Sequence, residues 1–289
     1  MSDAMTEPDR YFTPDDVIWR VSREMALMLG GGRALLMQAA HPLVVAGVDQ
    51  HSNYRSGPWG RLERTMEAVW TIVYGTRGDA DRTTARVRAM HRRVNGTIAE
   101  DMGPFPAGTR YDATDPDLLM WVHATLIDTA MLVYTSWVGP LSEDEQWSYY
   151  EDVKVTARMF GVTDEVMPAD LGEFRTWMDE RLASDEICVT PVARRTIEVV
   201  LHPSVPLALR PVLETLNLVT ASLLPEKLRE GYGLGWDPAR AALLTASRQW
   251  VKRVALPLMP DLIRAVGAAR EAEGRRTLPL RWLIPISEG

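Results

Sequence analysis

Helical periodicity runs through almost the whole chain and is the feature that most limits how it can fold. Apolar residues recur at spacings of three and four, whereas alternating runs rich in β-branched residues are few. We therefore predict an all-α fold and no strand. Caps, prolines and glycines predict helices over 13–28, 33–48 with a kink at Pro42, 62–74, 79–98, 116–138, 143–160, 171–183, 191–200, 211–223, 238–256 and 261–272. Among the caps, Asp115 precedes Pro116 at one helix start, and Ser142 and Glu145 have the spacing of a capping box at the next. The three glycines at 30–32 are expected to break or bend the chain between the first two.

Composition narrows the class of protein further. The chain has 289 residues, 46% of them hydrophobic, which is enough to bury a large core. We expect one helical domain over residues 1–289, with two closely packed lobes divided near 203–211 as the alternative. The formal net charge is -7 and the cations are mixed with acids, which argues against a nucleic-acid partner. Nothing in the sequence sets the oligomeric state.

A single cysteine limits the possible metal chemistry. It excludes an internal disulfide bond and a thiolate-rich zinc or iron-sulfur site. Histidine, carboxylate or methionine must therefore hold any metal. The HExxH, GxGxxG, P-loop and GxSxG patterns are missing, so the usual zinc-hydrolase, nucleotide-binding and serine-hydrolase interpretations lose support.

Two stretches bear on where the protein resides. Residues 1–16 are acidic and polar, unlike a signal peptide, so we expect a cytoplasmic protein. The stretch 118–138 has the length of a membrane span but carries His123, Asp128 and three threonines. We expect a buried core helix there and no stable membrane insertion.

His91 and His123 are the strongest candidate metal ligands among the five histidines. His123 is flanked by apolar residues on both sides, and His91 shares the predicted apolar stripe of its helix with Met90. If the helices on either side of residues 100–114 form an antiparallel hairpin, the two imidazoles stand at the same height. That geometry suits two axial ligands of a planar cofactor. The alternative for each is a core histidine bonded to a carbonyl or hydroxyl group.

The remaining polar candidates are less distinctive. Arg88, one turn before His91, is placed to pair with the carboxylate of a bound cofactor, but it also fits a solvated surface arginine. His41 lies beside the Pro42 kink and could line a pocket. His51 is expected at a helix C-terminus, where it complements the helix dipole, and His202 in a turn.

Four blocks of the sequence resemble one known family. They are LLMQAAHPLVVAGVDQHSNYRSGPWGRL, RVRAMHRRVNG, DPDLLMWVHATLIDTA and VGPLSEDEQWSYYEDV, and the resemblance extends over roughly Val21 to Met178. The chain resembles the latex-clearing rubber oxygenases and the fungal oxygenase that cleaves a prenyl chain in mycophenolic acid biosynthesis. The resemblance implies globin-like helix packing around a pocket for haem b. It also implies cleavage of a carbon-carbon double bond of an isoprenoid by dioxygen.

The resemblance also implies roles for individual residues. The histidine of WVHAT corresponds to the proximal haem ligand, which is His123 here. The RxxK segment of rubber oxygenases aligns with Arg88 to His91, so His91 replaces a lysine that can be a distal ligand, and Arg92 replaces the threonine after it. Either His91 binds iron, or it stays free as a hydrogen-bond donor to bound oxygen. Glu63 and Glu67 are candidates, by position alone, for the family's active-site glutamate.

The sequence therefore predicts a haem b-dependent oxygenase that uses O2 and a hydrophobic, isoprenoid or alkene-bearing substrate. His123 and His91 are the expected iron ligands, His91 and Arg88 the expected catalytic residues, and Arg88, Arg92 and His41 the expected further contacts to the cofactor. Two alternatives stay open: a haem peroxygenase or oxidase acting on another substrate, and a non-catalytic haem binder such as a sensor or electron carrier.

Overall fold

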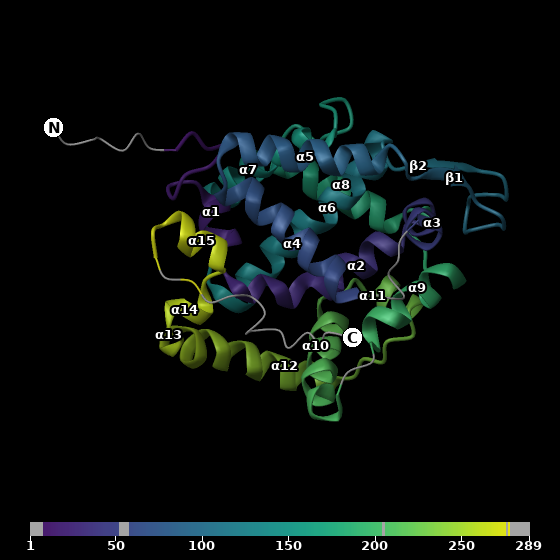
Figure 1. The fold of residues 1–289 in the computed structure, drawn as a ribbon. Helices are drawn as coiled ribbons and strands as arrows, with labels where there is room; N and C mark the ends of the chain where they lie inside the picture. The colour runs from purple at the N-terminus through teal and green to yellow at the C-terminus, as the bar shows by residue number, and fades with distance from the viewer. Residues whose placement is uncertain (1–7, 52–57, 204–205, 276, 278–289) are drawn as a thin grey trace.

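Helices account for almost all of the regular structure in the computed structural model, which describes residues 8–51, 58–203, 206–275 and 277 (Figure 1). The first half comprises α1 Val17–Ser22, the 3-10 helix η1 Met25–Gly30, α2 Gly31–Ala39, α3 Pro42–His51, α4 Pro58–Tyr74, α5 Arg77–His91, β1 Asn95–Thr97 and β2 Arg110–Asp112. The middle comprises α6 Pro116–Val133, the π-helix η2 Tyr134–Val138, α7 Glu143–Phe160, α8 Leu171–Ala183 and α9 Pro191–Leu201. The last part comprises η3 Leu207–Leu209, α10 Arg210–Leu223, α11 Glu226–Gly231, α12 Pro238–Trp250, the π-helix η4 Val251–Ala255, α13 Leu256–Leu258, α14 Asp261–Arg264 and α15 Gly267–Ala272. The predicted all-α class is confirmed, whereas the globin-like arrangement and the single domain stay predictions.

Helix α6 is the central element of the fold. It packs against η1, α2 and α7, and other helices surround it in Figure 1. Together with η2 it forms the stretch Pro116–Val138, the one helix of the described residues that is long and apolar enough to cross a membrane. Because 61% of its most apolar window is buried inside the protein, this stretch has the burial of a core helix.

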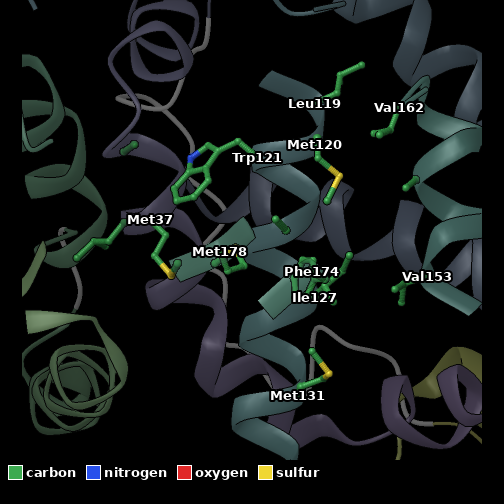
Figure 2. Packing of buried hydrophobic residues seen from close by; sticks show 14 of the residues in the cluster. Met37, Leu119, Met120, Trp121, Ile127, Met131, Val153, Val162, Phe174 and Met178 are labelled. Carbon is green, nitrogen blue, oxygen red and sulfur yellow. The ribbon is translucent and has the colours of Figure 1, made fainter. Parts of the chain in front are cut away.

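Buried side chains from several helices meet around α6. Figure 2 shows Trp121 of α6, Met37 of α2 and Met178 of α8 within one cluster, all less than 5% exposed. Methionine is unbranched and adapts its shape, so it fills the gaps that rigid aromatic rings leave between crossing helices. The core is therefore built around α6, from side chains of several helices.

The prediction that the chain contains no strand is wrong. Helix α5 ends at His91 and not at residue 98, and β1 and β2 then pair antiparallel with Gly96 opposite Tyr111. Each strand has only three residues, too few for an alternating pattern to stand out. Asn95 and Gly96, both weak helix formers, were the available signal for this early end. Met90, predicted to lie in the buried stripe of the helix, is 57% exposed.

The glycines at 30–32 do separate two helices, η1 and α2, and the structure shows why glycine is needed. A Cβ added to Gly32 would lie 2.2 Å from Thr220 Oγ1 of α10, and one added to Gly30 would lie 2.5 Å from Thr129 Cγ2 of α6. The backbone of Gly30 is itself right-handed helical, with φ of -83°. These glycines therefore serve the close approach of α2 to its neighbours.

The buried side chain of Arg33 also holds α2 against α6 and α10. Its side chain is buried and donates from Nε to the Leu223 carbonyl at 2.7 Å and from NH2 to Asp128 Oδ2 at 2.6 Å. A third bond reaches Thr129 Oγ1. A buried guanidinium is tolerated only when its donors are satisfied in this way, and here they join α2, α6 and α10.

Capping residues set the starts of the two helices that matter most for the site. Asp115 accepts a hydrogen bond from the Asp117 amide at the start of α6, where Pro116 fills the first position. Ser142 and Glu145 form a reciprocal capping box at the start of α7, with distances of 3.1 and 2.7 Å. Both caps were predicted from sequence and are confirmed.

Candidate functional site

His123 occupies a dry position in the middle of α6. It is 8% exposed, and its ring lies 5.2 Å, centroid to centroid, from that of Phe160 at the end of α7. No hydrogen bond joins its ring to any part of the chain that the structure describes. Burial, followed by the electrostatic effect of His91, lowers the pKa of His123 to about 4. The imidazole is therefore neutral near pH 7 and keeps a lone pair available.

His91 is the last residue of α5. Its Nδ1 atom is buried without a hydrogen-bond partner, and the rest of the side chain is partly exposed. Burial lowers the pKa of His91 below its usual value. A buried polar nitrogen without a partner costs free energy, typically about 1–3 kcal/mol, unless a ligand or water completes it.

The structure brings His91 and His123 near each other, although not through the helical hairpin that the sequence suggested. Helices α5 and α6 both pack against α7. The electrostatic effect of His91 on the pKa of His123 reports that proximity. Two neutral imidazoles in one apolar region form a pair of Lewis bases suited to a transition metal.

The predicted arginines lie on the surface near this pair. Arg88 is one turn before His91 and Arg92 follows it directly, and both side chains are exposed. Neither forms an ion pair within the described ranges of the chain. Their guanidinium groups are therefore available to a carboxylate, although a solvated surface position fits them as well.

His41 lies elsewhere. It is buried at the junction of α2 and α3, its Nδ1 accepts a hydrogen bond from the Leu43 amide at 3.3 Å, and its ring stacks on Phe105 at 5.8 Å. Burial, followed by the charge of Arg181, lowers its pKa to about 4. These neighbours are not those of His123, so the structure does not bring His41 into the His91–His123 pair.

The other sequence candidates also stay apart from the pair. His51 is the last residue of α3, as predicted, and its Nε2 shares a hydrogen bond with the Tyr111 hydroxyl at 3.0 Å. Glu67 is exposed on α4 and contacts neither histidine. The side chain of Glu63 lies outside the described residues.

Phe160 is the site residue that sequence reasoning missed. Its ring packs against that of His123. The sequence signal available for Phe160 was its position just before Gly161, which ends α7 in the left-handed conformation with φ of 104°. Elsewhere in the described ranges, no group of three or more histidine, cysteine or acidic residues could hold a metal ion. The pair supplies two ligands, so any metal held there must bring its other ligands with it.

Comparison with known proteins places this geometry in context. Residues 19–253 match the family model described as "ER-bound oxygenase mpaB/B'/Rubber oxygenase, catalytic domain". That span includes α5, α6 and α7, and so His91, His123 and Phe160.

Two curated mycobacterial proteins are similar to the chain. They are the uncharacterized protein Mb2261 of Mycobacterium bovis and the uncharacterized protein Rv2237 of Mycobacterium tuberculosis. Each is 26% identical over 211 residues, which cover 71% of this chain and 80% of the relative. No solved structure matches the chain.

Proposed function

The chain belongs to the family of mpaB-type and rubber oxygenases, and we propose that it is a haem b-dependent oxygenase acting on a hydrophobic, alkene-bearing small molecule. As a member of an oxygenase family, it is expected to use O2 together with a small-molecule substrate. The finer parts of the proposal, the haem and the nature of the substrate, rest on the residues around His123.

One observation supports the haem most directly: His123 is buried, neutral and without a hydrogen-bond partner in the described chain, and His91, which acts on it electrostatically, has an Nδ1 atom that is also buried without a partner. Haem brings four nitrogens of its own, so two imidazoles complete its coordination without further metal ligands. The exposed guanidinium groups of Arg88 and Arg92 suit its two carboxylates. The residues present therefore fit this cofactor.

Each of these residues has a distinct part in the proposal. When bound, haem would supply a redox-active iron for the activation of dioxygen. His123 would hold the cofactor through its unprotonated nitrogen, and Phe160 would keep that side free of water. His91 would either serve as a second ligand of the cofactor or present a proton at Nδ1, and Arg88 and Arg92 would orient the cofactor by its carboxylates.

The proposed reaction adds both atoms of O2 across one carbon-carbon double bond. The double bond breaks and each of its carbons becomes a carbonyl, so no external reductant is consumed. The apolar surroundings of His123 favour a hydrophobic substrate over a charged one. A peroxygenase acting on a different substrate would use the same histidine pair.

A non-catalytic haem binder is the second candidate, and the partnerless Nδ1 of His91 favours it. If both histidines bind iron tightly, no position is left for O2. The absorption spectrum of the protein purified after expression with added haem precursor distinguishes these functions. A Soret band that shifts with CO indicates an open or displaceable position and supports the oxygenase. A low-spin spectrum unaffected by CO supports the binder, and the absence of a Soret band refutes both.

Activity is tested directly by incubating the haem-loaded protein with a short polyisoprenoid under air. Carbonyl products can be trapped with a hydrazine reagent and identified by mass spectrometry. Incorporation of both atoms from labelled oxygen gas, in the two fragments, is the expected result. Incorporation only with added hydrogen peroxide would point to the peroxygenase.

A further inference from the structure

The run of helix from α12 through η4 to α13 carries an apolar face that nothing covers in the described chain. The run lies along the lower edge of the molecule in Figure 1. Its exposed apolar side chains are Leu243 at 61%, Trp250 at 59%, Val254 at 40% and Leu258 at 78%. We call these four side chains the outer face.

The outer face is a continuous stripe. Its members are spaced seven, four and four residues apart along the run, and such spacing keeps side chains within about 80° of one another on an α-helix. Other sides of the run are already used for packing, since Leu244 and Leu256 are only 4% and 6% exposed. Large apolar side chains exposed together on one surface mark a site that binds another protein, a membrane or a ligand.

The charge of the run indicates what kind of partner the outer face would bind. Residues 238–258 contain four cations and no acidic residue, in a chain whose formal net charge is -7. Arg240 pairs with Asp237, and Arg248 and Lys252 donate to Ser222 and to the Thr135 carbonyl. Arg253 is exposed and forms no ion pair with any described residue. An apolar stripe with an exposed, unpaired cation beside it and no acid along it complements an anionic surface that has an apolar interior.

We propose that the outer face docks on the surface of a membrane that contains anionic lipids. The run would lie in the interface, with the exposed ring of Trp250 at the level of the headgroups and Arg253 near lipid phosphates. It would not span the bilayer, because its other side packs on the protein through Leu244 and Leu256.

A second copy of the chain is a poorer partner for the same face. A symmetric dimer would bring the outer face of one subunit against that of the other. The exposed Arg253 of one run would then approach that of the other, and residues 238–258 supply no acid to pair with either. Like charges brought together in an interface oppose association.

Membrane docking does not depend on whether the protein binds haem, so the two proposals can be tested separately. The full-length protein is mixed with vesicles of phosphatidylcholine, with or without about 30% phosphatidylserine, and bound protein is measured by sedimentation. We expect binding to the vesicles with phosphatidylserine, and we expect added salt to weaken it because counterions screen the cations.

Two variants test the outer face, each with a matched control. Trp250→Ser combined with Leu258→Ser should weaken binding by about tenfold or more, because two large apolar side chains no longer enter the interface. Trp147→Ser, which changes a tryptophan 39% exposed on α7, should leave binding unchanged. Arg253→Glu should weaken binding only to anionic vesicles. Its control is Arg195→Glu, at a side chain 58% exposed on α9.

Three results would overturn the proposal. The first is that wild-type protein fails to bind anionic vesicles. The second is an equal loss of binding in the control variants. The third is a dimer in solution, detected by light scattering, that the Trp250 variant abolishes while vesicle binding is absent. Circular dichroism melting of each variant shows that the fold is retained, so a loss of binding reports on the surface.

Discussion

His91 acts electrostatically on His123, and this effect adds to that of burial to lower the pKa of His123 to about 4. The two imidazoles, one at the end of α5 and one in the middle of α6, therefore oppose each other's protonation. A buried pair of this kind costs the protein free energy when nothing is bound, because the Nδ1 atom of His91 has no hydrogen-bond partner. A ligand that accepts lone pairs from both sides would remove that cost, and this relationship underlies the predictions on haem.

Replacing His123 with alanine should remove haem from the protein during purification. The imidazole of His123 is the proposed iron ligand, and alanine offers no donor in its place. Haem content is measured as the ratio of Soret to protein absorbance after gel filtration. The control is His51→Ala, since His51 bonds to Tyr111 away from the pair and its loss should leave haem content unchanged. Equal haem in wild type and His123→Ala would show that another residue holds the iron.

Replacing His91 with alanine should keep haem but change its ligand state. The proposed ligand His123 would remain, whereas the imidazole of His91 would be lost. We expect the Soret maximum to shift and CO to bind faster than in wild type. A spectrum identical to that of wild type, with and without CO, would exclude His91 from the cofactor site.

Arg88→Gln should weaken haem binding by about tenfold. A hydrogen bond to a charged group typically contributes about 1.5–3 kcal/mol, and glutamine cannot pair with a carboxylate as a cation does. Arg86→Gln is the matched control, because Arg86 is exposed on the same helix but is not proposed to contact haem. Titration of haem into the haem-free variants gives both affinities. Equal losses in the two variants would mean that only the general positive charge of α5 matters.

Gly32→Ala should lower the free energy of unfolding by about 1–3 kcal/mol, because the new Cβ would meet Thr220 Oγ1 at 2.2 Å. Gly31→Ala is a control one residue away, since its Cβ would meet nothing within 4 Å. We expect Gly31→Ala to be neutral or stabilising by up to about 1 kcal/mol. Urea unfolding measures both. Adding Thr220→Ala should recover part of the loss in Gly32→Ala, and a purely additive double variant would contradict the contact.

Acid should destabilise the haem-free protein partly through His41. Its folded-state pKa of about 4 lies below the unfolded value of 6.5, so the unfolded chain takes up the proton first. The stability that neutral His41 contributes is complete above pH 6.5 and falls as the pH drops towards 4. His123 titrates in the same range, so the test is the difference between wild type and His41→Asn.

Between pH 7.5 and 4.5, that variant should lose about 2–3 kcal/mol less than wild type in denaturant unfolding. Asparagine can still accept a hydrogen bond near the Leu43 amide, so the local structure has a substitute acceptor. Parallel pH profiles for the two proteins would contradict a buried neutral His41.

The helical class and several of the helix starts could be predicted from sequence. Periodicity gave the helices, Asp115 and the Ser142–Glu145 pair gave the starts of α6 and α7, and the apolar flanks of His123 indicated its burial. These features depend on residues close together in the chain, where spacing and capping chemistry decide the outcome.

Contacts between distant segments were not predictable in this way. The helix expected to reach residue 98 ends at His91, because the residues after it pair with β2 and not with their own helix. Phe160 reaches His123 only through the packing of α7 on α6. His41, a candidate by sequence, is buried among other neighbours.

The sequence by itself therefore determined that this protein is helical, that His123 is buried and which family it resembles, since each follows from residue types and their spacing. Only the tertiary structure decided that His91 acts electrostatically on His123, that Gly32 packs closely on Thr220, and that Trp250 and Leu258 are exposed. The reason is physical. Periodicity fixes which side of a helix is apolar, but which helix covers that side is set by the packing of the whole chain.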